Sequence, residues 1–180
     1  MKNITILISF LLGITVTGIS QTIPNKDWVK NYSSTDSLYN FPTAIDANGN
    51  VIVAGYSLVL GQSYNYTVIK YDNSGNQLWV RSYNDAVNGA DQATALEVDN
   101  AGNIYVTGSS QTALSGLNYV TIKYDGNGNQ LWLASFNGVG NGNDVPTGIA
   151  VDAVGNVFVT GSTIGSSTGS DYGTVMYNSL

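Results

Sequence analysis

The stretch Asp99–Ser110, DNAGNIYVTGSS, decides the fold because the chain carries it twice more in slightly altered form. It occurs earlier as DANGNVIVAGYS from Asp46 and later as DAVGNVFVTGST from Asp152, so consecutive copies start 53 residues apart. A period of about this length is typical of proteins whose units cannot bury their faces alone and therefore stack on one another. The sequence thus predicts an array of three similar units.

Each unit contains four short segments with the composition of β-strands, rich in Val, Ile, Thr and aromatic residues. In the middle copy they are TALEVD from Thr94, NIYVTGS from Asn103, YVTIKYD from Tyr119 and QLWLASF from Gln130. Tight turns join the first segment to the second and the third to the fourth, which predicts an antiparallel meander with Gly102 and Gly155 at positive φ. Neither face of the third segment is strongly polar, so these sheets should stack on both sides. The expected fold class is all-β, each four-stranded unit being a blade of a β-propeller.

The predicted strands do not add up to whole four-stranded units at the two ends of the array. The expected units lie at residues 43–84, 94–137 and 147–177. Residues 28–32, WVKNY, match WVRSY from Trp79 and predict a displaced fourth strand, and alignment of Pro42 with Pro146 places two missing residues in the first strand of unit one. The last unit shows only three strands, so two chains exchanging residues 28–32 would close a six-bladed ring. Open arcs, longer partners and a truncated fragment explain the same strand count.

The first 20 residues differ in composition from the repeats. Lys2 precedes an apolar run from Ile4 to Val16, and small residues stand before Gln21, which is typical of a secretory signal peptide. An uncleaved anchor or a buried strand is the alternative, but the run falls short of the ~20 apolar residues that span a bilayer. We expect a signal peptide at 1–20, a repeat domain at 21–180 and a secreted, cell-surface or periplasmic protein. The chain has no cysteine, so disulfides do not stabilise it.

The charge of the chain argues against nucleic acids as partners. The sequence has 12 acidic and 6 basic residues and a formal net charge of −6. Binding to phosphate backbones needs a basic stripe, and the few basic residues are widely dispersed. Anionic membrane surfaces are disfavoured for the same reason.

The repeated motif resembles a known family. DNAGNIYVTGSS followed by YVTIKYDGNGNQLW is similar to the SBBP repeat of bacterial secreted and surface proteins, over roughly Thr43 to Tyr177. The resemblance implies β-propeller blades in an extracellular setting and supplies no catalytic residues. YDNSGNQLW from Tyr71 also resembles the turns of quinoprotein and sialidase-like propellers. That resemblance implies that Trp28, Trp79 and Trp132 pack between blades.

Catalysis and metal binding find little support in the residues present. Histidine and cysteine are absent, which removes the commonest general base and the strongest nucleophile. Glu97 is the only glutamate, and most aspartates fall in turns, although a glycosidase-like carboxylate pair stays an alternative. Residues 46–50 and 125–129 place oxygen side chains at alternate positions, as Ca²⁺ prefers, but the sister turns do not. We therefore expect no enzyme, no metal site and no cofactor.

The longest connections predict where a ligand would bind. They join the second strand of each unit to the third and should emerge at the end of the sheets opposite the tight turns. The candidate ligand-binding residues at that end are Asn40, Tyr64, Asn65, Asp91, Asn118, Asp144 and Asp171. They could hydrogen-bond a polyol such as a glycan, and loop capping explains them equally. The leading hypothesis is a non-catalytic binding or adhesion module for a glycan or protein. A structural spacer, a fragment of a larger surface protein and a carbohydrate-active enzyme fragment are the alternatives.

Overall fold

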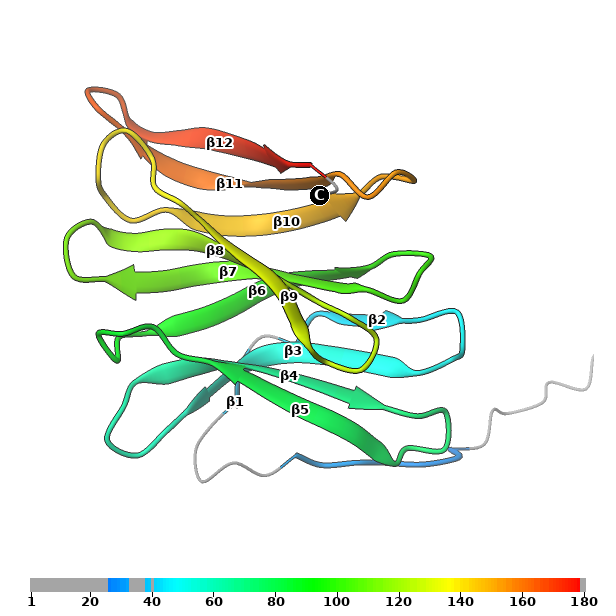
Figure 1. The fold of residues 1–180 in the computed structure, drawn as a ribbon. Helices are drawn as coiled ribbons and strands as arrows, with labels where there is room; N and C mark the ends of the chain where they lie inside the picture. The colour runs from blue at the N-terminus through cyan, green and yellow to red at the C-terminus, as the bar shows by residue number, and fades with distance from the viewer. Residues whose placement is uncertain (1–25, 33–37, 40, 179–180) are drawn as a thin grey trace, which may run out of the picture.

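The computed structural model describes residues 26–32, 38–39 and 41–178 as three antiparallel sheets stacked on one another (Figure 1). The expected signal peptide and Asn40 lie outside these residues. The strands are β1 (Leu38–Tyr39), β2 (Thr43–Ile45), β3 (Val51–Leu58), β4 (Tyr64–Tyr71), β5 (Gln77–Tyr83), β6 (Asp91–Val98), β7 (Ile104–Thr112), β8 (Gly116–Tyr124), β9 (Gln130–Phe136), β10 (Val145–Val151), β11 (Val157–Gly165) and β12 (Gly169–Tyr177). The described residues form no helix, and thus none that could cross a membrane.

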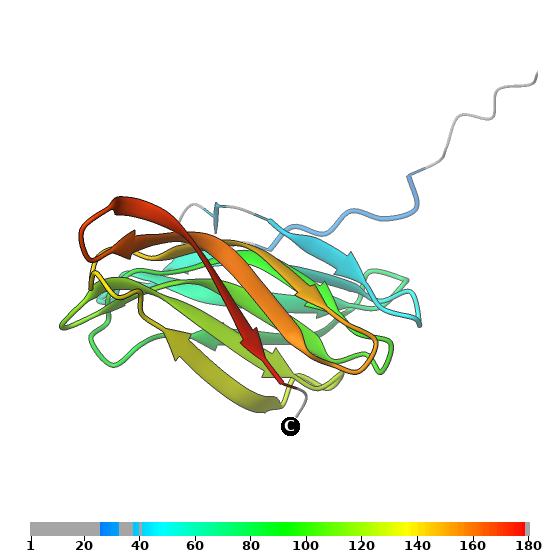
Figure 2. The same ribbon diagram turned by 90° about the horizontal axis from the view of Figure 1, so that it is seen from above.

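Each sheet is one unit of the repeat and is called a blade below. Blade 1 contains β1 to β5, blade 2 contains β6 to β9, and blade 3 contains β10 to β12, all paired antiparallel. In blade 1 both β1 and β2 pair with β3, and elsewhere neighbours in sequence pair with each other. Figure 2, which looks along the stack, shows the blades lying over one another with their twisted strands rotated from sheet to sheet. This architecture confirms the prediction of an all-β fold made of propeller blades.

Side chains alternate between the two faces of each blade, and both faces of blade 2 are buried. Val120, Ile122 and Tyr124 of β8 pack into a core shared with blade 1. Tyr119, on the opposite face of β8, packs into a second core together with Val157 and Val159 of blade 3. The near-continuous apolar character of β8 therefore reflects burial on two sides, as the sequence predicted.

At each of the two interfaces between blades, one tyrosine forms hydrogen bonds to the following blade. The Tyr66 hydroxyl crosses from blade 1 and donates a hydrogen bond to the Val120 carbonyl at 3.2 Å. The Tyr119 hydroxyl crosses from blade 2 in the same way and donates to the carbonyls of Ser162 at 3.2 Å and Gly173 at 3.4 Å. Burial raises the pKa of Tyr119 to about 12, so this donor keeps its proton throughout the physiological range.

Five tight turns share one hydrogen-bond pattern. In the Asp99–Asn103 turn, Oδ1 of Asp99 accepts bonds from the backbone N–H of Ala101 and Asn103, and Oδ2 accepts one from the Asn103 amide. The glycine of each turn has positive φ, including Gly102 at 82° and Gly155 at 89°, which confirms that prediction. Only glycine adopts this conformation without strain.

The tryptophans pack between blades, as expected. Trp79 lies against Tyr124, with ring centroids 6.3 Å apart, and its indole N–H donates to the Gly126 carbonyl at 3.2 Å. Trp132 makes the equivalent contact with Tyr177 at 5.6 Å. The indole of each blade thus covers the third strand of the blade that follows.

Two predictions about the first unit need correction. Leu38 pairs with Ser57 and Asp91 pairs with Ser110, so the spacing of 53 residues already holds where β1 begins. The two missing residues therefore lie between Tyr32 and Leu38, not in the first strand. The alignment of the two prolines was misleading because they occupy different positions of the repeat. Thr43 pairs with Val53 as Ile149 pairs with Val159, so Pro42 corresponds to Gly148 and not to Pro146. Residues 28–32 form no strand in the structure, although Trp28 still packs on Tyr71 of blade 1.

Candidate functional site

The long connections lie at the end of the strands opposite the tight turns, as predicted (Figure 1). Two of the candidate residues at that end are directed inwards. Asp91 is fully buried and accepts hydrogen bonds from the Ser110 hydroxyl and, at 2.9 Å, from the Asp85 backbone N–H. Burial raises the pKa of Asp91, and these hydrogen bonds oppose that rise. The carboxylate closes the loop between blades 1 and 2.

Asp144 repeats this arrangement one blade further on. It is fully buried, and its two oxygens accept bonds from the backbone N–H groups of Gly138 at 2.7 Å and Ile164 at 3.0 Å. A carboxylate that bridges two backbone segments in this way holds the loop in one conformation. Asp91 and Asp144 thus have the geometry of loop closure.

The remaining candidates are divided between buried and exposed positions. The Asn65 amide donates to Gln62 at 2.6 Å, and Asn118 accepts a bond from the Ser115 hydroxyl at 3.0 Å, and both asparagines are buried. Asp171 is exposed at the tip of blade 3 and accepts a bond from Thr168. Tyr64 packs edge-on against Tyr56 with centroids 5.4 Å apart. Of the candidates within the described residues, Tyr64 and Asp171 are those that face solvent, Tyr64 in part.

A polar groove between blades 2 and 3 lies at the other end, beside the tight turns. It encloses about 540 Å³ and is lined from blade 2 by Glu97, Asp99, Tyr105 and Lys123, among others, and from blade 3 by the Asp152 turn. Glu97, Tyr105 and Lys123 are direct neighbours across β6, β7 and β8. They therefore form one row on the face of blade 2 that is turned toward blade 3.

Hydrogen bonding within this row leaves two charged groups available. The Tyr105 hydroxyl donates to Oδ2 of Asp99 at 2.9 Å, and the Lys123 ammonium lies 5.1 Å from the centre of the Tyr105 ring. Burial alone would raise the pKa of Asp99, but the hydrogen bonds from Asn103 and Tyr105 outweigh it and lower that pKa. Among the described residues, neither the Glu97 carboxylate nor the Lys123 ammonium has a hydrogen-bond or ion-pair partner.

The equivalent row of blade 1 is closed. There Ala44, Ile52 and Lys70 occupy the three positions, and the Lys70 ammonium forms an ion pair of 2.9 Å with Asp46. The same ammonium donates to the Gly126 carbonyl of blade 2 at 3.1 Å. Burial would raise the pKa of Asp46, but hydrogen bonds from Lys70 and Asn50 lower it to about 2.

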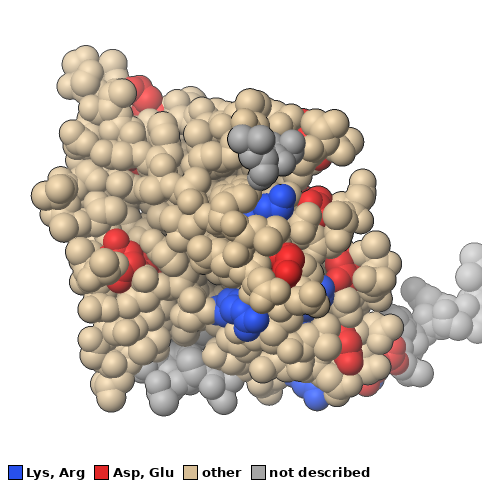
Figure 3. Space-filling model, viewed as in Figure 1, with Lys and Arg blue, Asp and Glu red and all other residues tan. Residues whose placement is uncertain are grey.

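Charge on the surface is concentrated near this groove. On the face shown in Figure 3, all the basic and most of the acidic side chains lie over the centre and the end with the tight turns, while the long-loop end shows acidic side chains alone. Sequence reasoning missed this end because the tight turns looked purely structural. The available signal was the departure from the repeat, since Glu97 and Tyr105 stand where blade 1 has Ala44 and Ile52.

The turn aspartates use their oxygens within their own turns. Asp46, Asp72, Asp99, Asp125 and Asp152 each accept two backbone N–H groups and one asparagine amide. In the described residues no three acidic side chains converge as a metal site. Hydrogen bonding within the turn is the observed role of these carboxylates.

Stacked four-stranded blades of one repeat length define a β-propeller repeat protein. Comparison with protein families matches residues 138–172 to the SBBP family, described as a β-propeller repeat. That stretch runs from the loop before β10 to the middle of β12. Residues 138–172 are thus an SBBP-type β-propeller repeat. A search of curated proteins found no match to the chain.

Proposed function

We propose that the chain is a non-catalytic binding module and that its ligand occupies the groove between blades 2 and 3. The observation that carries the proposal is the row Glu97, Tyr105 and Lys123, which replaces an apolar and ion-paired row in blade 1 with unpaired charges. The rest of the repeat is accounted for by packing and by turn formation. Departures from a structural repeat are where a function would be located.

The composition of the groove favours a neutral ligand rich in hydroxyl groups, such as a glycan. Glu97, Asp99 and Asp152 outnumber Lys123 as charged groups, so an anion would be repelled. Carboxylates accept hydrogen bonds from hydroxyl groups, and an ammonium group donates hydrogen bonds to them. This ligand class agrees with the glycan expected from the sequence but moves its site to the opposite end of the blades.

The test is a glycan array probed with the purified chain, followed by calorimetric titration of any hit. Glu97→Ala and Lys123→Met should each weaken binding at least tenfold, because each removes a polar group that the protein leaves unpaired. Lys123→Met places the residue of blade 3 at this position and so preserves the fold. Asp171→Ala and Tyr64→Ala, at the long-loop end, are the controls.

The outcomes separate the hypotheses. Weakening by the two control variants alone would move the site back to the long-loop end. Absence of binding to glycans and to surface proteins would favour a structural spacer. Cleavage of a bound glycan, detected as new reducing ends, would contradict a non-catalytic role.

We also propose that the chain is exported, since residues 1–20 have the pattern of a signal peptide. Mass spectrometry of protein recovered outside the cytoplasm should show an N-terminus at Gln21. Exported protein that retains Met1 would contradict this cleavage.

A further inference from the structure

One position of the repeat is buried twice and exposed once. Successive members of the series Tyr66, Tyr119 and Tyr172 are 53 residues apart. They occupy the same position of the third strand in blades 1, 2 and 3. Tyr66 and Tyr119 are 0% exposed, whereas Tyr172 is 98% exposed. An aromatic side chain that is this exposed, and whose two equivalents are fully buried, identifies a surface built to be covered.

The buried tyrosines enter a hole that a glycine creates in the next blade. A Cβ on Gly108 would lie 2.7 Å from the Tyr66 hydroxyl, and one on Gly161 would lie 2.9 Å from the Tyr119 hydroxyl. The same Cβ would also clash with a backbone carbonyl oxygen of the neighbouring strand, that of Gln92 or that of Val145. Each glycine is therefore needed both for pairing with its own neighbouring strand and for the close approach of the tyrosine. Gly55 is the equivalent glycine of blade 1, and no described blade precedes it.

Gly55 borders a hollow of about 320 Å³ on the outer face of blade 1. This hollow is lined by residues 30–32, from the segment before the blade, and also by Val53, Thr67, Ile69 and Tyr71 of the blade. Their equivalents in blade 2 include Val106, Ile122 and Tyr124, which are buried against blade 1. The outer face of blade 1 thus has the side chains of a blade interface, and a hollow remains there beside residues 30–32.

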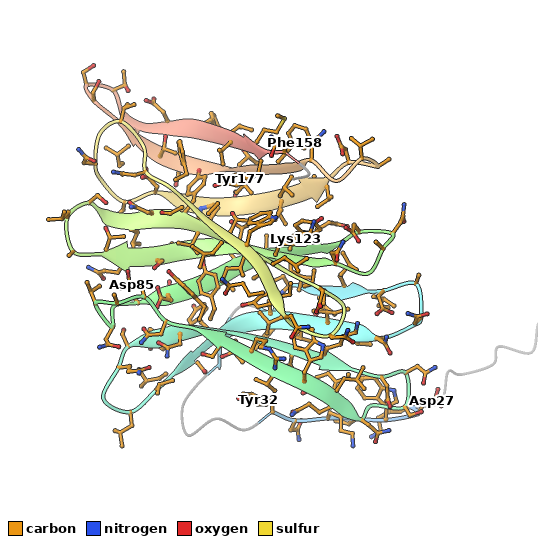
Figure 4. All side chains as sticks on the ribbon, viewed as in Figure 1. Asp27, Tyr32, Asp85, Lys123, Phe158 and Tyr177 are labelled. Atoms are coloured by element: carbon orange, nitrogen blue, oxygen red, sulfur yellow. The ribbon has the colours of Figure 1, made fainter. Side chains whose placement is uncertain are left out.

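The outer face of blade 3 shows the complementary exposure. Phe158 is 38% exposed and Met176 56%, whereas the equivalents of Phe158, Ile52 and Tyr105, are both 0% exposed. Figure 4 shows Phe158 and Tyr32 at opposite ends of the stack, so these two open faces cannot meet within one chain.

Residues 28–32 already occupy the place of a fourth strand that precedes blade 1. The Trp28 indole donates to the Asn73 carbonyl at 3.1 Å, as Trp79 does to Gly126 one repeat later. A Cβ on Gly75 would meet the Trp28 ring at 2.8 Å, and one on Gly128 would meet the Trp79 ring at 2.9 Å. This segment has the position of a fourth strand but no paired third strand.

We infer that the outer face of blade 3 docks on the outer face of blade 1 of a second copy of this chain, with Tyr172 in the hollow at Gly55. Residues 28–32 of that copy complete blade 3 as its fourth strand. The registers of blades 1 and 2 fix the pairing, with Tyr172 opposite Tyr32 and Met176 opposite Trp28. The inference is independent of any ligand in the groove.

A second copy is the occupant because the two open faces belong to one sequence and match the two internal interfaces position by position. The contact is head-to-tail, which gives a ring if the rotation closes. Propellers close with about 4 to 8 blades, and two copies of the three described blades supply six. Pairing also covers the free edge of β12, which would otherwise invite aggregation.

The first test is light scattering of the purified chain across a dilution series. We expect twice the 19.0 kDa mass of one chain, less any processed leader. Tyr172→Asp should give a monomer with unchanged circular dichroism, because this side chain makes no contact within the monomer. Leu60→Asp, a change at a 96% exposed loop residue, should leave the dimer intact. A monomeric wild type, or a dimer insensitive to Tyr172→Asp, would overturn the inference.

The second test uses the absence of cysteine from the chain. Val29→Cys and Val175→Cys are purified separately, mixed and treated with a short thiol cross-linker, since the register places these residues opposite each other. Mass spectrometry should find the 29–175 cross-link in a species of two chains. Val154→Cys, in an exposed turn of blade 3, should give far less product with Val29→Cys. Equal yields, or only assemblies longer than two copies, would contradict the two-copy ring.

Discussion

The interface between blades 1 and 2 and the interface between blades 2 and 3 use the same repeat positions but end differently beside the tight turns. In the first, Lys70 reaches Asp46 and the next blade, and the end is closed. In the second, the Tyr105 hydroxyl takes the place of the ammonium at Asp99, and Lys123 lies over the tyrosine ring. Two changes, Ala44 to Glu97 and Ile52 to Tyr105, therefore separate an ion-paired seal from a groove with unpaired charges.

The shared part of the two interfaces should carry most of their stability. Tyr66→Ala and Tyr119→Ala each remove a fully buried ring and its hydroxyl contacts, and each should lower the free energy of unfolding by about 4 kcal/mol. Urea unfolding of both variants is the measurement. Tyr66→Phe and Tyr119→Phe, which keep the ring, should lose far less. A difference of several kcal/mol between the two alanine variants would show that the interfaces are not equivalent.

The stability of the fold should depend on the ion pair of Lys70 at the closed interface but not on Lys123 at the open groove. Lys70→Met leaves Asp46 buried without its partner and should destabilise the fold by about 3 kcal/mol, whereas Lys123→Met should change stability by under about 0.5 kcal/mol. Thermal and urea unfolding at neutral pH compare the two. Equal losses would contradict the different roles of these lysines.

The same pair predicts an acid limit. The pKa of Asp46 is lower in the folded chain, about 2, than in the unfolded chain, so its contribution to stability is present above the unfolded pKa and is lost as pH falls toward 2. Unfolding measured from pH 6 to pH 2, values chosen to bracket the usual Asp pKa of about 3.9, should show this loss. In Lys70→Met the acid-dependent part attributable to Asp46 should shrink. An unchanged pH profile would remove Asp46 as its source.

The destabilisation caused by replacing a turn glycine with alanine should depend on which atoms lie next to the added Cβ. Gly102 has no atom within 4 Å of an added Cβ, so Gly102→Ala should cost about 1 kcal/mol through its positive φ alone. At Gly128 an added Cβ would also press on the Trp79 ring at 2.9 Å, so Gly128→Ala should cost about 2 kcal/mol. Urea unfolding of the two variants measures the difference. A smaller loss at Gly128 would show that Trp79 gives way.

The smallest expected effect is a shift in the pKa of one carboxyl group, that of Asp99 in the groove. Tyr105→Ile copies blade 1 and should let Lys123 reach Asp99, which lowers the pKa of Asp99 further. Tyr105→Phe removes only the hydroxyl and should raise that pKa. NMR titration of the Asp99 carboxyl distinguishes them. Shifts in the same direction would show that Lys123 does not compete with Tyr105 for Asp99.

The sequence was sufficient for the blades because their signals are local and repeated. Strand alternation, turn glycines and the spacing of the tryptophans each appear in more than one copy, and the structure bears them out at Gly102, Gly155 and Trp79. The start of the first blade was misplaced because two prolines at different positions of the repeat were aligned. Only the ladder from Leu38 to Ser57 shows the register there.

The candidate site was harder to predict because direction matters as much as position. Asp91 and Asp144 were correctly expected near the loop end, but their carboxylates turn inward to backbone N–H groups. Tyr105 lies 8 residues after Glu97, and Lys123 lies 18 residues after Tyr105. They become one row only when the cross-strand partners are known.

The contacts that join the blades also set an order in which a growing chain can fold. Tyr66 is anchored 54 residues downstream and Trp79 47 residues downstream, always in the following blade. A ribosome or an export channel delivers the N-terminal end first, so each blade emerges before the surface that buries its tyrosine and tryptophan exists. A nascent chain therefore carries one uncovered aromatic face on the blade that emerged most recently. As synthesis proceeds, this face is covered by the next blade, which then carries the uncovered face.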